Sequence, residues 1–102
     1  MVQNYYSLGL MSGSSLDGLD ICYSRITENE NTYSYEILSS TTVAFPINLL
    51  NSLKNCRNYS LDDLKQLDLY FGKWVGEMCR TYLEERKIFN LNFIASHGHT
   101  VY

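Results

Sequence analysis

The pattern of apolar and polar positions in the first 40 residues is that of β-strands separated by short polar segments. The run from Tyr5 to Met11 carries no charge and favours strand, which predicts a central strand covered on both faces. Residues 19–24 then alternate with the period-two pattern of a half-buried strand. A polar turn at 28–31 separates them from a third alternating run at 33–37. We therefore expect a three-strand meander that opens with a β-hairpin.

The middle of the chain changes to helical spacing. Pro46 lies just inside the expected start of a short helix, where its missing N–H costs nothing. Ser60, with Asp63 three residues later, predicts the start of a long helix that runs from about Leu61 to Arg86. The apolar stripe of this long helix consists of Leu64, Leu67, Phe71, Trp74, Val75, Met78, Tyr82 and Leu83.

Two features of the long helix need an explanation. Gly72 and Gly76 each cost about 1 kcal/mol of helix propensity relative to alanine, and close packing against the sheet is the expected reason. The aromatic residues could form a stacking surface for a sugar or a base, but helical spacing favours the core. We therefore assign to core packing Tyr70, Phe71, Trp74 and Tyr82.

The last periodic segment, Asn92 to Ser96, predicts a short buried strand. A meander followed by a helical crossover produces a mixed sheet whose last strand lies parallel to the first. The order of elements therefore predicts an α/β fold of the ribonuclease-H-like, actin-like ATPase type. This half domain would contain a mixed sheet of a three-strand meander plus a parallel strand, with a short and a long helix.

Composition and charge narrow the class of protein. A chain of 102 residues with 45% hydrophobic content and one proline suits one folded domain. A net charge of −3 provides no basic field for nucleic acid, and no segment resembles a signal peptide or approaches the ~18 apolar residues of a membrane span. We expect a cytoplasmic protein without nucleic-acid or membrane partners. Its three cysteines, without a CxxC pair, suggest reduced, packed side chains: Cys22, Cys56 and Cys79.

The candidate chemistry lies in the segment GLMSGSSLDGLD, from Gly9 to Asp20. It lacks the GxxxxGK[ST] pattern of a Walker loop, and a strand rather than a helix follows it, which excludes a dinucleotide fingerprint. Its glycines let successive N–H groups converge on an anion, and its serine hydroxyls add donors. Asp17 could hold Mg²⁺ through water beside a polyphosphate. On composition alone, an ordinary turn is the more frequent outcome for such a loop.

Two motifs carry a resemblance to a known family. The pattern GxMSGxSxDGxD after a first strand resembles the phosphate-binding hairpin of the anhydro-N-acetylmuramic acid kinases. The motif SHGHT, from Ser96 to Thr100, resembles that family's HGQT element after the fourth strand. Ser14 stands where threonine is usual and keeps the hydroxyl, whereas His99 replaces the usual glutamine. Two motifs in the correct order are far more specific than one.

The resemblance implies a bacterial kinase that uses ATP and Mg²⁺ to convert 1,6-anhydro-N-acetylmuramic acid to N-acetylmuramic acid 6-phosphate in peptidoglycan recycling. ATP and the amino sugar would be its partners, and a homodimer of the full-length protein stays open. His97 and Thr100 would face the sugar, and Asp17 would hold the metal through water. The carried-over residues that would contact or shape the site for the ATP phosphates are Gly13, Ser14, Ser15, Leu16, Asp17, Gly18, Leu19 and Asp20.

Proteins of that family are several times longer, and their catalytic aspartate, in an FDxGPGN-like segment, has no counterpart here. We expect residues 1–102 to be the N-terminal part of the first actin-like ATPase domain, inactive alone. Two alternatives stay open: a non-catalytic or differently specific ATP- or phosphate-binding member of the superfamily, and a stand-alone structural domain. A metal pair at His97 and His99 is less favoured because no third ligand lies nearby in the sequence.

Overall fold

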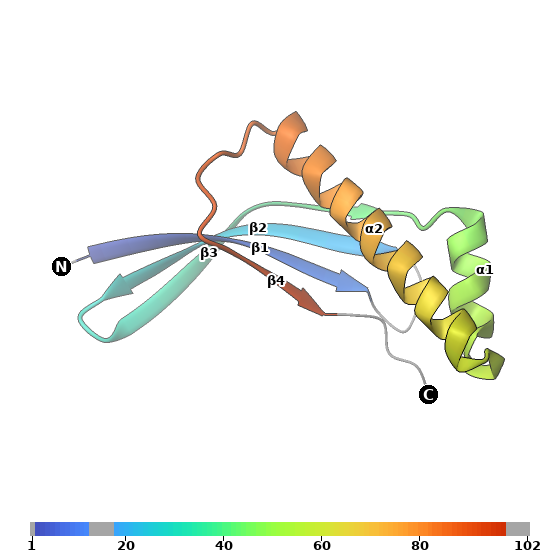
Figure 1. Cartoon of the computed structure of the whole chain (residues 1–102). Helices are drawn as coiled ribbons and strands as arrows, with labels where there is room; N and C mark the ends of the chain where they lie inside the picture. The colour runs from blue at the N-terminus through green and yellow to red at the C-terminus, as the bar shows by residue number, and fades with distance from the viewer. Residues whose placement is uncertain (1, 13–17, 98–102) are drawn as a thin grey trace.

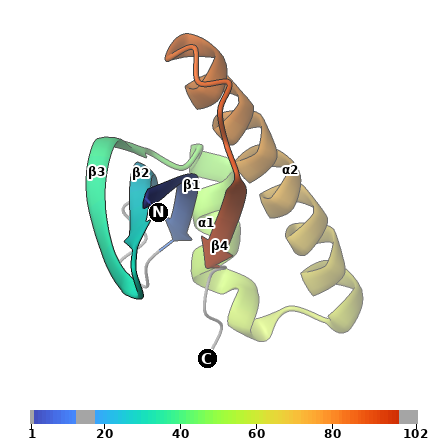
Figure 2. The same ribbon diagram turned by 90° about the vertical axis from the view of Figure 1, so that its left-hand side faces the viewer.

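The computed structural model describes residues 2–12 and 18–97, which form a mixed sheet with two helices on one of its faces (Figures 1 and 2). The strand order is β3-β2-β1-β4, with antiparallel β1–β2 and β2–β3 pairs and a parallel β1–β4 pair. The elements are β1 (Val2–Ser12), β2 (Leu19–Asn29), β3 (Thr32–Val43), α1 (Ile47–Asn55), a 3₁₀ turn (Cys56–Asn58), α2 (Leu61–Glu85) and β4 (Phe93–His97). This arrangement confirms the predicted α/β fold, with a meander, a parallel fourth strand, and a short and a long helix.

The turns and caps follow from local sequence. Glu30 and Asn31 adopt positive φ angles of 50° and 70°, as the tight turn between β2 and β3 requires. The Ser60 hydroxyl accepts a hydrogen bond of 3.2 Å from the Asp63 N–H, which confirms the predicted start of α2. Pro46 precedes α1 as its N-cap, with a ψ of 147°, and so lies one residue before the position predicted for it.

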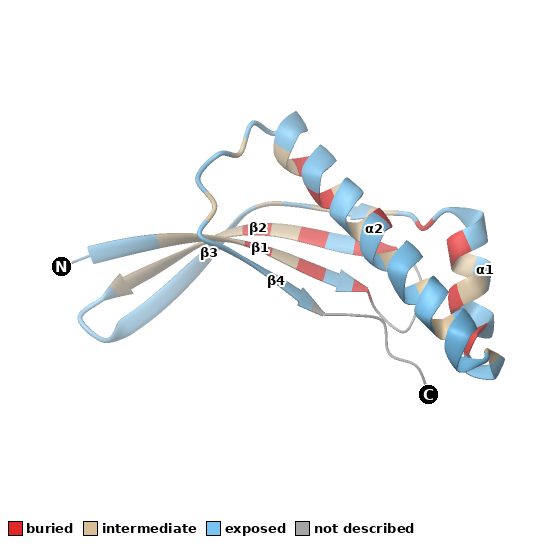
Figure 3. Ribbon diagram, viewed as in Figure 1, coloured by how far each residue is buried: buried red, intermediate tan, exposed pale blue. Residues whose placement is uncertain are grey.

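The core forms where α1 and α2 cover β1 and β2 (Figure 3). Alternate residues of the two strands point toward the helices, which confirms the period-two prediction for β2. Trp74 of α2 is 7% exposed, and its ring packs against Phe45 with centroids 5.3 Å apart. The buried hydrophobic residues are Leu8, Leu10, Leu19, Ile21, Tyr23, Phe45, Leu49, Leu53, Cys56, Trp74, Cys79 and Tyr82.

Two predictions about burial, for β1 and β4, were wrong, because no described element covers the surfaces concerned. β1 is central, but helices cover only one of its faces, and Met11 on the other face is exposed. β4 has the predicted direction, yet Phe93 and Ile94 are about half exposed. The alternating residues of β3 are exposed as well, because β3 lies at the edge of the sheet and extends past the helices: Tyr33, Tyr35 and Ile37.

The prediction for the glycines of α2 was also wrong. A Cβ atom built at Gly72 or Gly76 meets nothing within 4 Å, so neither residue is needed for close packing against the sheet. Of the four aromatic residues assigned to the core, Trp74 and Tyr82 are buried and Phe71 is half-buried, whereas Tyr70 is 43% exposed. A helical stripe indicates the side that faces the sheet, but it does not give the distance between the two layers.

The three cysteines are free thiols, as predicted. Cys56 and Cys79 are buried, and Cys22 is half-buried. Burial raises the pKa of the Cys79 thiol, which disfavours the reactive thiolate.

Candidate functional site

The two sequence motifs meet at one end of the sheet, where β1 and β4 end and β2 begins. β1 ends at Ser12 and pairs there with Leu19, where β2 begins, so the segment GSSLDG connects two hydrogen-bonded strands as the predicted hairpin requires. The parallel register of β4 brings His97 opposite Met11, one residue before the end of β1. The backbone therefore brings the start of the second motif beside the first, although they come from opposite ends of the chain (Figure 1).

Several predicted site residues lie outside the described part of the chain. They are Gly13, Ser14, Ser15, Leu16, Asp17 and Thr100. The site is therefore built here from the strand ends on either side of them.

Gly18 has a backbone role that only glycine can fill. Its φ is 155°, and a Cβ atom at this position would lie 2.4 Å from the Val43 carbonyl oxygen and 3.2 Å from the Cα of Ala44. Real Cβ atoms do not approach backbone this closely, and the contact atoms belong to the end of β3 rather than to a flexible side chain. Gly18 thus lets the end of the hairpin loop lie directly against β3.

Asp20 is an exposed carboxylate beside the hairpin loop. It lies between the buried residues Leu19 and Ile21 on β2, so it points to the face of the sheet opposite the helices. The Thr42 hydroxyl of β3 donates a hydrogen bond of 2.6 Å to Asp20 Oδ1. This bond restricts the carboxylate while leaving it open to solvent.

Leu19 is a core residue, in contrast to the exposed Asp20 that follows it. Its side chain is 1% exposed and belongs to the core between the sheet and the helices. Any contact of Leu19 with a phosphate would therefore have to come from its backbone.

Thr42 was not predicted to belong to this site, because its contact with Asp20 depends on the register of β2 and β3, which the sequence does not reveal. Ser12 is one of the serines whose hydroxyls were expected to add donors to the hairpin. Its hydroxyl is buried and has no hydrogen-bond partner among the described residues. An unpaired buried hydroxyl is costly, so Ser12 Oγ is a hydroxyl available to a neighbouring polar group.

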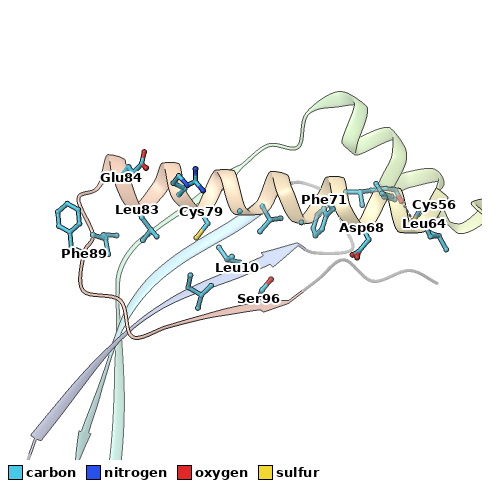
Figure 4. Close-up of a pocket in the computed structure, with 18 residues that line it drawn as sticks. Leu10, Cys56, Leu64, Asp68, Phe71, Cys79, Leu83, Glu84, Phe89 and Ser96 are labelled. Carbon is cyan, nitrogen blue, oxygen red and sulfur yellow. Dashed lines mark hydrogen bonds between the residues drawn. The ribbon is translucent and has the colours of Figure 1, made fainter. Parts of the chain in front are cut away.

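A second concave feature lies between α2 and the strands β1 and β4 (Figure 4). This groove has a volume of about 920 Å³, and its walls are mostly apolar. Its floor includes Leu10 and Ile94, and one wall includes Leu67, Val75 and Leu83 of α2. The described site residues Gly18, Leu19 and Asp20 do not line it. Leu10 and Ser96, which belong to the two motifs, do line it, so the groove adjoins the hairpin site.

The fold and the strand register together define the class of protein. It is an α/β protein with the half-domain fold of actin-like ATPases. Its glycine- and serine-rich hairpin connects β1 to β2 at the end of the sheet where β1 and β4 both end. No helix among the described residues is long and apolar enough to cross a membrane.

The chain belongs to the anhydro-N-acetylmuramic acid kinase family, whose model matches residues 4–102. This match confirms the resemblance carried by the two motifs.

Relatives named anhydro-N-acetylmuramic acid kinase come from several bacteria. The anhydro-N-acetylmuramic acid kinase of Pseudoalteromonas translucida is 36% identical over 100 residues, which cover 93% of this chain and 25% of the relative. The anhydro-N-acetylmuramic acid kinase of Clostridioides difficile is 29% identical over 102 residues, which cover 95% of this chain and 27% of the relative. The enzyme of the same name from Francisella tularensis subsp. novicida is 31% identical over 107 aligned positions, which cover 100% of this chain and 28% of the relative. The chain thus spans about a quarter of the length of these relatives.

Proposed function

We propose that this chain supplies the ATP-phosphate site of a kinase that converts 1,6-anhydro-N-acetylmuramic acid to N-acetylmuramic acid 6-phosphate in peptidoglycan recycling. The proposal joins the family to the chemistry of the hairpin. The single observation that carries it is the pairing of His97 with Met11 beside the Ser12–Leu19 end of the hairpin. This register brings both family motifs to the same end of the sheet, where one small ligand could reach both.

In this proposal, the backbone N–H groups and hydroxyls of the loop bind the ATP phosphates. Phosphoryl transfer depends mainly on positioning and on stabilising negative charge, and converging N–H donors contribute to both. The contact of Gly18 with the backbone of β3 would hold one end of the loop in place. His97 and Thr100 would face the amino sugar. The residues assigned to the phosphates, from the loop and the start of β2, are Gly13, Ser14, Ser15, Leu16, Asp17, Gly18, Leu19 and Asp20.

The described residues fit a hydrated Mg²⁺ in the same region. Asp20 is an exposed carboxylate next to the loop, and the Thr42 hydroxyl bonds to one of its oxygens. Mg²⁺ usually keeps several waters and takes one or two carboxylates, so few protein ligands are needed. Asp17 would hold the ion through water, with Asp20 beside it, and the bound ion would neutralise charge on the phosphates. Within the described ranges, no cluster of three or more metal-ligating side chains occurs.

The test of this function uses a family-length chimera, in which residues 1–102 are joined to the part of the Pseudoalteromonas translucida relative that the chain does not match. We expect it to transfer phosphate from ATP to 1,6-anhydro-N-acetylmuramic acid, measured by mass spectrometry of the 6-phosphate product. A folded chimera that consumes no ATP with this sugar, while the intact relative does, would refute the proposal.

The chain by itself should bind ATP weakly and transfer no phosphate. It offers a few backbone donors in water, where each net hydrogen bond contributes about 1 kcal/mol, and no segment resembling the family's catalytic aspartate region. Titration calorimetry is expected to give a dissociation constant in the millimolar range or no measurable heat. Micromolar affinity for ATP would show that the nucleotide site has been assigned wrongly.

Asp17→Asn in the chimera should lower kcat at least tenfold without loss of folding. The substitution removes the carboxylate of the loop itself, which the proposal assigns to the hydrated metal. Glu30→Gln is the matched control, because Glu30 lies in the turn at the other end of β2 and should leave kcat unchanged. Equal kcat for Asp17→Asn and the parent across a Mg²⁺ titration would remove Asp17 from the site.

A further inference from the structure

The start of β4 is fixed to β1 by two hydrogen bonds from one residue, Asn92. The Asn92 N–H donates to the Tyr6 carbonyl oxygen at 2.8 Å, and Asn92 Oδ1 accepts from the Tyr6 N–H at 2.7 Å. The pairing of β4 with β1 begins at the next residue, where Phe93 lies opposite Ser7. Asn92 thus continues the register of β4 backward by one residue, and its side chain takes the place of a further strand residue in bonding the Tyr6 N–H.

Hydrophobic patterning specifies the register of β4 only weakly. Ile94 lies opposite Leu8 and shares its face of the sheet, whereas Phe93 points to the other face, and Ile94 and Phe93 are both about half exposed. A shift by one residue would exchange the two faces, and a strand with apolar residues on both faces opposes such a shift little. β4 has only five residues and pairs, among the described strands, with β1 alone. The bonds at its start therefore have a large share in deciding the register.

The segment between α2 and Asn92 is anchored as well. It leaves the helix through a tight turn at Lys87, whose φ of 55° is left-handed, as is common just after a helix. Further along, Asn90 Oδ1 accepts a hydrogen bond of 3.1 Å from the Tyr23 hydroxyl of β2. The Tyr23 ring stacks on that of Tyr6, with centroids 6.0 Å apart. The connection is thus held at the end of α2, at Asn90 and at Asn92, so it delivers β4 to one place on β1.

The register of β4 determines where the second motif lies. His97, the last residue of β4, lies opposite Met11 near the end of β1. A slip by one residue would move His97 along β1 by about 3.3 Å and turn alternate residues to the other face. Misplacement by as little as about 1 Å can already impair a group that positions a substrate. Correct placement of the second motif therefore depends on what fixes the start of the strand.

We propose that Asn92 is a positioning residue: its two bonds with Tyr6 set the register of β4 and so bring His97 to the end of β1, beside the hairpin. Because the amino sugar is assigned to the second motif, Asn92 affects binding of the sugar and not of the phosphates. This consequence rests on the proposed function. The register itself depends only on the contacts of β1 with Asn92 and β4.

The register is tested in residues 1–102 by nuclear magnetic resonance. Asn92→Leu keeps the size of the side chain and removes the acceptor, whereas Asn92→Asp keeps an acceptor oxygen. We expect Asn92→Leu to speed hydrogen exchange of the Tyr6 amide by about fivefold or more and to lose the backbone NOE between Met11 and His97. Asn92→Asp should retain both features of the parent. Asn4→Leu is the matched control, because Asn4 also accepts one exposed hydrogen bond, 2.9 Å from the Thr27 hydroxyl, but that bond joins β1 to β2.

The consequence for the sugar is tested in the family-length chimera, with the second substrate saturating in each titration. Asn92→Leu should raise the KM for the amino sugar by about fivefold or more and change the KM for ATP by less than about twofold, because the hairpin belongs to β1 and β2. A general structural defect would shift both constants. Asn92→Asp should have the KM values of the parent, and so should Asn4→Leu.

Three results would overturn the proposal. They are parental Tyr6 protection and an intact Met11–His97 NOE in Asn92→Leu, an Asn92→Asp variant that behaves like Asn92→Leu, and equal shifts of the two KM values. A chimera that transfers no phosphate would instead refute the proposed function. In that case the exchange and NOE measurements on residues 1–102 still decide whether Asn92 sets the register of β4.

Discussion

Trp74→Ala is expected to destabilise the chain by about 3–5 kcal/mol. Trp74 is 7% exposed at the centre of α2, and its ring lies against Phe45, whose own exposure is 8%. Alanine would leave a cavity at the contact between α2 and the segment that follows β3. Small domains have only about 5–15 kcal/mol of stability, so this loss is a large fraction of the total.

The measurement is thermal unfolding followed by circular dichroism, with Leu69→Ala as the control on the same helix. Leu69 is 68% exposed, so its truncation should change the free energy of unfolding by less than about 0.5 kcal/mol. Trp74→Ala should be unfolded or aggregated, or should melt more than about 12 °C below the parent. If it instead melts within a degree or two of the parent and loses only a ligand, the stripe of α2 is an interaction surface and the packing argument is wrong.

Gly18→Ala is expected to cost about 2–4 kcal/mol, the sum of a strained backbone and a steric overlap. The new Cβ would lie 2.4 Å from the Val43 carbonyl oxygen, and the φ of 155° is one that side-chain-bearing residues rarely adopt. Relief would require moving either the start of β2 or the end of β3. Because both flank the proposed phosphate loop, we also expect the chimera carrying Gly18→Ala to lose phosphate transfer.

Gly9→Ala provides the matched control for that substitution. Gly9 lies on the neighbouring strand, and its added Cβ would be 3.8 Å from the Cys22 carbonyl oxygen, an ordinary contact. We expect its free energy of unfolding to change by less than about 1 kcal/mol. Equal stability of the two alanine variants in urea denaturation would show that the close approach to β3 does not require glycine at position 18.

Local patterns predicted the elements because local energetics determine them. Alternation indicated β2, the Ser60 hydroxyl and Asp63 N–H indicated the start of α2, and the order of strands and helices led to the mixed sheet with a parallel β4. The two motifs led to the family. These features depend on residues close together in the sequence, where spacing and capping carry the information.

Predictions that depended on neighbours across the fold were less successful. The apolar residues of β4 read as buried, but burial depends on a cover that the described residues do not supply. Gly72 and Gly76 were assigned to sheet packing, whereas they line an open groove. The bond from Thr42 to Asp20 depends on strand register across the meander, which alternation alone leaves undetermined. A sequence pattern states which side of an element is apolar, but not what faces it.

The most direct test of the account is a crystal structure of the family-length chimera with a non-hydrolysable ATP analogue and Mg²⁺. We expect the terminal phosphates within hydrogen-bond distance of backbone N–H groups between Gly13 and Gly18, with the hydrated metal near Asp17 and Asp20. Phosphates bound elsewhere, with the hairpin loop facing empty solvent, would contradict the assignment of this loop as the phosphate site.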